Sequence, residues 1–146
     1  MQREQASETI LHASCVALAG QGLLILGESG SGKSGLSLGL MAMGADLVAD
    51  DRVILSRTEK AIVASAPDTI DGLIEARGIG LLNASSCGPV PVVCVVDLDQ
   101  TETARMPPPR QTVLLGHSVT LLLKTETPHF PAALIQFLKE GRQAER

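Results

Sequence analysis

Apolar and polar positions come in blocks along the chain, and these blocks predict an order of strands and helices. Two apolar runs, SCVALAG (14–20) and GLLILG (22–27), meet around a Gly-Gln-Gly sequence, a pattern typical of a β-hairpin. Apolar positions from Lys33 to about Met43 suit a helix, and Gly44 is a natural stop for it. We therefore expect a hairpin and then a helix in the first third of the chain.

The middle of the chain is rich in predicted strands. ADLVADD (45–51) predicts a short buried strand that ends in two acids, and RVILSRTEKAIVASA (52–66) predicts a second hairpin. LIEARGIGLLN (73–83) begins extended and is interrupted by glycines. PVPVVCVVDLD (89–99) is a strongly β-branched strand with acids at its end.

The last third begins with TETARMPPPRQ (101–111), a polar, proline-rich stretch that we expect to form an irregular and mobile loop. TVLLG and SVTLLLK predict two further strands. Pro128 or Pro131 is expected to open a final amphipathic helix through Lys139, after which GRQAER frays. The pattern is that of an α/β fold with more hairpins than a doubly wound sheet. Its length of 146 residues predicts one domain, residues 1–146.

Composition narrows the function classes. Hydrophobic residues make up 45% of the chain but aromatic residues only 1%, so the core must be aliphatic. The net charge of −4, without a basic block, argues against a nucleic-acid groove. Cys15, Cys87 and Cys94 lack the spacing of a zinc site and are interpreted as buried thiols in a reducing compartment. The polar start and the lack of an apolar run of about 20 residues predict neither signal peptide nor membrane span. We expect a soluble, cytoplasmic protein.

GESGSGKS (27–34) carries the clearest chemistry. It matches the phosphate-binding pattern G-x-x-x-x-G-K-S in full and lies between a predicted strand and a predicted helix. Its glycines let backbone N–H groups turn toward phosphate oxygens, Lys33 reaches the outer phosphates, and the Ser34 hydroxyl is placed to bind Mg²⁺. The residues that we expect to hold the phosphates are Gly27, Glu28, Ser29, Gly30, Ser31, Gly32, Lys33 and Ser34.

Two adjacent acids, Asp50 and Asp51, follow the strand after this helix. On an extended chain their side chains point in opposite directions, so at most one of them faces a bound γ-phosphate. One could act as general base on an incoming hydroxyl while the other supports the metal. A solvated turn is the alternative interpretation. Asp97 and Asp99 offer a rival metal-binding strand end, for which we favour a surface turn.

Three further residues stay open on the residue pattern alone. Glu75 is a lone acid among apolar residues and could pair with Arg77 or bind a metal. His12 precedes the first strand of the hairpin, where an exposed histidine is the default. Arg105 lies in the proline-rich loop, where it could neutralise a transferring phosphoryl group or be simply exposed.

A resemblance to a known family bears on these choices. The stretches LH (11–12), GESGSGKS (27–34), LVADDRV (47–53) and IEARGIGLLN (74–83) resemble the catalytic domain of HPr kinase/phosphorylase, whose nucleotide site is related to that of phosphoenolpyruvate carboxykinase. The last stretch is the most discriminating. The resemblance covers residues 11–110, and the tail 111–146 matches only loosely. It implies a P-loop nucleotide-binding domain with a mixed sheet and flanking helices.

The resemblance also implies roles. Asp51 would accept the proton of the target serine, with His12 beside it, and Lys33 would hold the β- and γ-phosphates. Ser34 and Glu75 would bind Mg²⁺, with support from Asp50, and Arg105 would assist transfer from a mobile loop. The substrate would be a serine of HPr, the phosphocarrier of a phosphotransferase system, and the donor ATP or pyrophosphate. The reverse activity would attack phosphoserine with inorganic phosphate.

Departures from the family set further expectations. Longer members carry an extra N-terminal domain, which we expect to be absent, as in the short forms of α-proteobacteria. They also form hexamers, whose contacts need not persist here. The segment after Arg105 lacks a Lys-Thr-Gly-Arg-like loop linked to phosphorolysis, with Lys124-Thr125 the nearest trace, so the kinase direction is better supported. A small-molecule kinase and a nucleotide-sensing module without catalysis are the alternatives.

Overall fold

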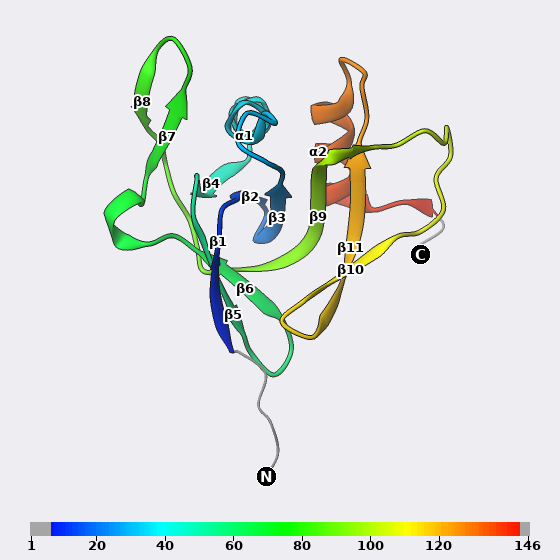
Figure 1. Ribbon diagram of the computed structural model, residues 1–146, viewed down its shortest axis with the longest axis horizontal. Helices are drawn as coiled ribbons and strands as arrows, with labels where there is room; N and C mark the ends of the chain where they lie inside the picture. The colour runs from blue at the N-terminus through cyan, green and yellow to red at the C-terminus, as the bar shows by residue number, and fades with distance from the viewer. Residues whose placement is uncertain (1–6, 144–146) are drawn as a thin grey trace.

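The computed structural model describes residues 7–143, and a mixed β-sheet with two helices on one face forms its frame (Figure 1). The hairpin expected at the start is present as β2 (Ser14–Leu18) and β3 (Gln21–Leu26), and helix α1 spans Lys33–Ala42. The helix ends where predicted, because the N–H groups of Met43 and Gly44 close its last turn.

The remaining predicted strands also form. They are β4 (Asp46–Ala49), the hairpin β5 (Val53–Arg57) and β6 (Ile62–Ser65), β7 (Leu73–Ala76), β9 (Val90–Thr101), β10 (Gln111–Leu114) and β11 (His117–Lys124). Helix α2 spans Phe130–Glu140 with Pro131 in its first turn, so the second of the two candidate prolines lies at the helix start. Residues 102–110 contain no helix or strand, as expected. The predicted fraying falls partly on residues 144–146, outside the described residues.

Three short elements were not predicted from the sequence. Strand β1 (Glu8–Leu11) pairs with β5, strand β8 (Gly80–Asn83) returns along β7, and a 3-10 turn covers Asp68–Ile70. Neither strand has a buried residue: positions in β1 alternate between exposed and half-buried, and β8, which begins at a glycine, is mostly exposed. Pairing with a neighbouring strand, and not burial of one face, therefore keeps both extended.

Strand β9 joins the parts of the sheet. The strand order is β1-β5-β6-β9-β3-β2-β4, with β11 also pairing with β9 and β10 with β11. Residues 92–97 of β9 pair parallel with β3 and residues 94–101 pair parallel with β11, whereas β6 pairs antiparallel with its beginning. The sheet is therefore mixed, as expected, with its parallel strands at the centre.

Two aliphatic clusters fill the two faces of this sheet. Leu23 and Ile25 of β3 point toward α1 and α2, while Leu24 between them points to the opposite face. The helices cover the first face, and the curled β1–β5–β6 end of the sheet closes over the second. Both phenylalanines of the chain, Phe130 and Phe137, lie on α2 and pack at the edge of the helical cluster.

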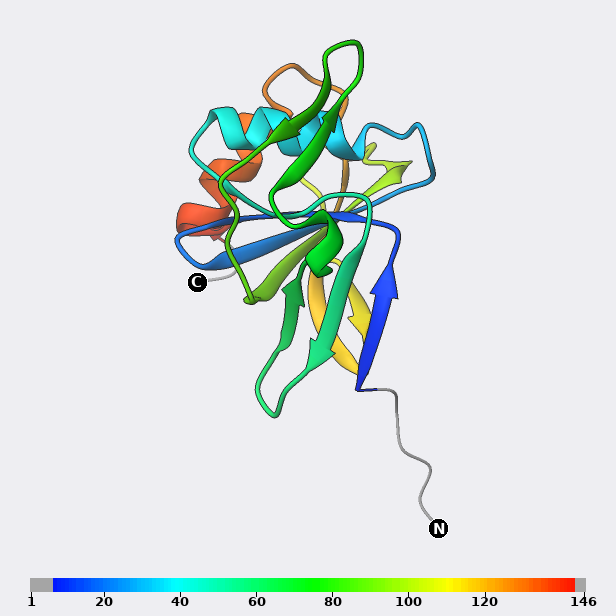
Figure 2. The same cartoon turned by 90° about the vertical axis from the view of Figure 1, so that its left-hand side faces the viewer.

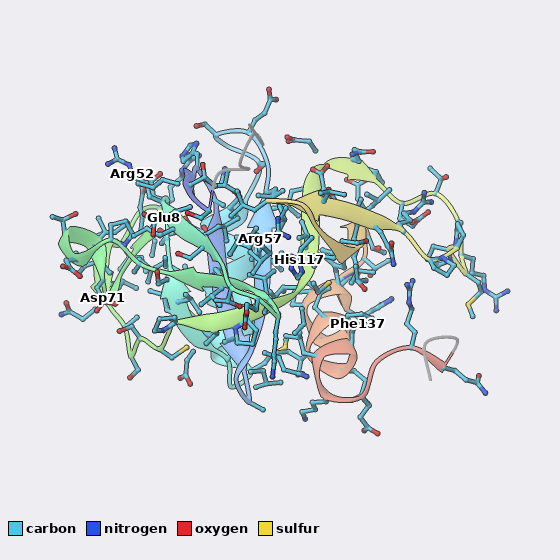
Figure 3. All side chains as sticks on the ribbon, turned by 90° about the horizontal axis from the view of Figure 1, so that it is seen from below. Glu8, Arg52, Arg57, Asp71, His117 and Phe137 are labelled. Carbon is cyan, nitrogen blue, oxygen red and sulfur yellow. The ribbon has the colours of Figure 1, made fainter. Side chains whose placement is uncertain are left out.

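Two contacts show how the outer elements are fixed. In Figure 2 the β7–β8 hairpin runs across α1 on the outside of the molecule. In Figure 3, viewed from below, Arg57 of β5 lies beside His117 of β11, and the Arg57 guanidinium donates a hydrogen bond to the carbonyl of Leu115 at 2.9 Å.

No helix in the described part of the chain is both long and apolar enough to cross a bilayer.

Candidate functional site

The glycine-rich loop leaves the centre of the sheet at the end of β3 and enters α1. Gly32, the residue before the helix, has φ 102°, a backbone conformation that side-chain-bearing residues rarely adopt. A Cβ at Gly27 would collide with the Ser31 side chain and lie 3.2 Å from Cβ of Leu98. The loop therefore needs glycine at Gly32 for its backbone conformation and at Gly27 for space, and loops of this kind characteristically turn their N–H groups toward a bound anion.

Hydrogen bonds hold the loop at both ends. Lys33 is 7% exposed, and its Nζ donates to the carbonyls of Gly27 at 2.7 Å and Glu28 at 3.0 Å. The third N–H of the ammonium remains for an anion. On the other side, the N–H of Glu28 lies 3.1 Å from both carboxylate oxygens of Asp99. Asp99 thus anchors the loop, a contact that the sequence did not indicate.

Asp50 is the centre of a buried network beneath the loop. It is 5% exposed, and its Oδ1 accepts hydrogen bonds from the hydroxyls of Ser14 and Ser34, each at 2.7 Å. Its Oδ2 accepts the backbone N–H of Glu75 at 3.2 Å. One carboxylate therefore connects strand β2, the start of α1 and strand β7. Three donors make this burial of a carboxylate tolerable.

The Asp51 side chain points away from that of Asp50, as expected. The cause is a tight turn at Asp51 and not the extended chain expected from the sequence. Asp51 lies in a three-residue turn closed by the N–H of Arg52 and the carbonyl of Asp50 at 2.8 Å, with φ 73°. Such a backbone conformation is strained for a residue other than glycine and is characteristic of functional sites. The turn directs the Asp51 carboxylate to the surface, where Nε2 of His12 lies 2.8 Å from its Oδ1.

These residues surround one pocket of about 470 Å³ between the loop, α1 and β7. Five of the eight motif residues line it: Ser29, Gly30, Gly32, Lys33 and Ser34. His12, Asp51 and Glu75 lie on its wall as well. Gly27, Glu28 and Ser31 are not among the lining residues, and their contribution is to the shape of the loop.

Arg77, considered from the sequence only as an ion-pair partner of Glu75, is a cation of the pocket wall. It lines the pocket together with Glu75, and no ion pair joins the two within residues 7–143. Arg77 follows β7 directly, in the turn to β8, and its closeness in sequence to Glu75 was the signal that could have found it. Ser14 was missed because a small buried hydroxyl in an apolar strand has no distinctive pattern.

The structure does not bring Arg105 to the pocket. It is exposed in the segment 102–110, which lies beyond α2 and β11 from the β7–β8 hairpin (Figure 1). Asp97 is likewise outside the pocket wall, and its carboxylate accepts hydrogen bonds from the N–H of Asp99 and the amide of Gln100, each at 2.8 Å. The surface turn expected for Asp97 and Asp99 is wrong: both lie inside β9, where Asp97 is paired with Leu26 and Leu123, and pairing with β11 extends the strand to Thr101.

A metal ion would find oxygen ligands here. In the part of the chain that the structure describes, no group of three His, Cys, Asp or Glu side chains could hold a metal by itself. The Ser34 hydroxyl and the Glu75 carboxylate line the pocket, while Asp50 lies outside its wall and reaches it through Ser34. Mg²⁺ commonly uses one or two carboxylates and completes its shell with water and substrate phosphates. The residues therefore fit a Mg²⁺ that arrives with a phosphate ligand.

Comparison with known proteins extends this picture. A family model described as HPr Serine kinase C-terminal domain matches residues 3–89. The HPr kinase/phosphorylase of Clostridium tetani is 41% identical over 86 residues, which cover 59% of this chain and 28% of that protein. The HPr kinase/phosphorylase of Polaromonas naphthalenivorans is 44% identical over 84 residues, 57% of this chain and 27% of that protein. The chain thus matches little more than a quarter of the length of these relatives.

A solved structure matches over nearly the whole chain. The Hpr(Ser) kinase/phosphatase from Coxiella burnetii aligns with a TM-score of 0.75 and 26% sequence identity, over 94% of this chain and 92% of that one. The likeness therefore includes β9 to α2, beyond the residues that the family model matches.

Proposed function

The chain belongs to the family of HPr serine kinase C-terminal domains, and from this premise we propose that it transfers a phosphoryl group from ATP or pyrophosphate to a serine of an HPr-type phosphocarrier. The observation that carries the proposal is the single pocket in which a phosphate-binding loop faces Asp51, His12 and Glu75. A nucleotide-binding module without catalysis needs the loop but not the carboxylates.

The proposed reaction uses the residues of the pocket in separate roles. The N–H groups of the loop and Lys33 hold the phosphate chain in place. Asp51 accepts the proton of the serine hydroxyl as its oxygen forms a bond to the terminal phosphorus and the bond to the leaving group breaks. His12 orients the Asp51 carboxylate through the 2.8 Å contact. Both side chains are more than half exposed, 61% for Asp51 and 54% for His12, so a serine on a protein surface can reach them.

The metal part of the proposal involves one hydroxyl, that of Ser34, and two carboxylates, those of Glu75 and Asp50. Ser34 and Glu75 would bind Mg²⁺, and Asp50 would act on it through the Ser34 hydroxyl that it holds at 2.7 Å. Bound Mg²⁺ would neutralise charge on the phosphate oxygens during transfer. Arg77, on the pocket wall, supplies a positive charge near the transferring group. Arg105 would assist only if its loop moves to the pocket.

The kinase direction is proposed as the stronger one. Phosphorolysis needs a second anion site for inorganic phosphate behind the phosphoserine. After Arg105 the chain offers few groups that could bind such a phosphate. Arg110 is already paired with Glu102, since its Nε and Nη2 each donate to a Glu102 oxygen at 3.0 Å. Prolines 107–109 contribute no N–H. The reverse rate with phosphoserine-HPr and millimolar phosphate should therefore fall well below the forward rate.

Accessibility to a protein serine separates this proposal from a small-molecule kinase. The test is to incubate the protein with HPr, Mg²⁺ and labelled ATP or pyrophosphate and to locate the label. We expect it on one serine of HPr, and Lys33→Ala should abolish it. Lys60→Ala, at the exposed β5–β6 turn, is the matched control and should keep it. Donor binding without label on HPr would contradict the proposal. A cytoplasmic location is proposed with it, since the three cysteines are free thiols.

A further inference from the structure

A second hollow of about 400 Å³ adjoins the phosphate-binding loop on the side away from Asp51. Ser31, Gly32, Leu36 and Leu98 form one wall, and residues 124–131, apart from His129, form the other. Figure 1 shows the reason for two hollows: α1 lies between the β7–β8 hairpin and the connection from β11 to α2. Gly32 lines both hollows, so they meet at the loop.

The walls of the two hollows differ in chemistry. Leu38 is the one large aliphatic side chain on the wall of the first hollow, whose other residues are polar, charged or glycine. The second hollow has several apolar side chains: Leu36, Leu98, Pro128, Phe130 and Pro131. Lys124 and Thr127 add polar groups at its wall. An apolar cleft with a few polar groups is the usual surrounding of a flat heterocycle rather than of a phosphate.

Two side chains that line the second hollow, Ser31 and Thr127, have buried hydroxyls without a hydrogen-bond partner among the described residues. The Oγ1 of Thr127 is buried and has no hydrogen-bond partner within the described residues. Buried hydroxyls are nearly always hydrogen-bonded, so an unpaired one calls for an explanation. Thr127 lines the second hollow, and a hydroxyl can both donate to and accept from a ribose hydroxyl or a ring nitrogen bound there.

The proposed function fixes the direction of the donor. Its reacting end must lie in the first hollow, beside Asp51, and its phosphate chain follows the loop amides. The other end must leave the loop elsewhere, and the second hollow is continuous with the loop at Gly32. We infer that the second hollow binds the base and ribose of a nucleoside triphosphate donor. This inference rests on the proposed function and assigns residues 124–131 to nucleotide recognition.

A consequence separates the two donors of the proposed reaction. Pyrophosphate has no nucleoside and occupies the loop alone, whereas ATP and ADP occupy the loop and the second hollow. A probe in the second hollow should therefore respond to a nucleotide and not to pyrophosphate. The chain contains no tryptophan or tyrosine, so an introduced tryptophan is the only strong fluorophore.

The test uses Glu126→Trp, which places the probe on the wall of the second hollow, and Glu59→Trp, a matched exchange of an exposed glutamate at the distant β5–β6 turn. Mg·ADP should change the emission of the first variant saturably, with the affinity that calorimetry gives. Pyrophosphate should leave this emission unchanged, and Glu59→Trp should respond to neither. Pro128→Trp provides a second probe on the same wall if the first variant does not fold.

Each outcome has a distinct meaning. Emission at position 126 that stays unchanged while calorimetry shows Mg·ADP binding would overturn the nucleoside site and leave the proposed function standing. An equal response to pyrophosphate would overturn it as well. Binding of neither ADP nor pyrophosphate in calorimetry would overturn the proposed function together with the inference.

Discussion

The imidazole Nε2 of His12 lies 2.8 Å from Oδ1 of Asp51, although 39 positions separate the two residues in the sequence. The sheet explains the contact: His12 comes just before β2, Asp51 just after β4, and these strands pair antiparallel with Cys15 opposite Ala49. The N–H of Ala13 also donates to the carbonyl of Asp51 at 3.2 Å. The backbone therefore brings the pair together, while both side chains stay accessible.

Removal of His12 should affect turnover more than binding. In His12→Ala the Asp51 carboxylate loses the group that orients it, so we expect kcat for phosphoryl transfer to fall about tenfold or more, by less than the effect of losing a general base itself. Nucleotide affinity should stay unchanged, because His12 does not belong to the loop. Steady-state kinetics and calorimetry measure the two quantities. His117→Ala, at the start of β11 and outside the pocket wall, is the control, and equal kinetics for both variants would contradict the role of His12.

The Asp50 network predicts an effect on stability. Ser14→Ala removes one of the two hydroxyls that donate a hydrogen bond to Oδ1 of Asp50. Loss of a donor to a buried carboxylate lowers the free energy of unfolding by about 1–3 kcal/mol. Urea denaturation should show this loss in the free energy of unfolding. Ser118→Ala removes an exposed hydroxyl that donates to Gln111 at 2.6 Å and should change stability by no more than about 0.5 kcal/mol. If the two variants are equally stable, the Ser14 contact contributes nothing.

The Glu102–Arg110 pair predicts a pH dependence. Hydrogen bonds from the Arg110 guanidinium, and next from the N–H of Ala104, lower the pKa of Glu102 below its ordinary 4.5. Because the folded-state pKa is the lower one, the stability that the pair contributes is present above the ordinary pKa. It is lost as the pH falls through the folded-state value.

Denaturation of the protein and of Glu102→Gln as a function of pH checks this. The wild-type protein should be more stable at neutral pH, and its advantage should shrink as the pH falls below 4.5. Glu59→Gln gives the effect of removing an exposed carboxylate elsewhere. An advantage that persists unchanged in acid would show that the pair does not depend on the charge of Glu102.

Much of the fold could be predicted because its elements carry their own signals. The hairpin 14–26 and the helix from Lys33 follow from apolar spacing and glycines, and the α/β class follows from their order. Strands β1 and β8 could not be predicted, since their pairing with β5 and β7 and not their own sequence keeps them extended. The triple pairing of β9 is likewise a property of the whole sheet.

The candidate site was predicted unevenly for the same reason. Lys33 and Ser34 belong to a local motif that sequence alone singles out, and both line the pocket. Glu75 and His12 reach the pocket through long-range pairing, and only the family resemblance selected them. The contacts of Ser14 and Asp99 were missed, because they join segments far apart in the chain, and the place of Arg77 on the pocket wall was missed as well. Arg105 is the opposite case: it was selected from the sequence, but it does not lie at the pocket, because a suitable residue type in a loop does not determine where the loop lies.

The most direct measurement of the central claim compares binding and transfer in Asp51→Asn. Asparagine tolerates the positive φ of 73° at this position and keeps an oxygen for the contact with His12, so the fold should persist. We expect Mg·ATP affinity in calorimetry to stay unchanged, while phosphoryl transfer to the HPr serine falls by at least about 10², the usual scale for a general base. Asp97→Asn should retain transfer. Near-normal transfer in Asp51→Asn, with loss in Asp97→Asn, would contradict the account.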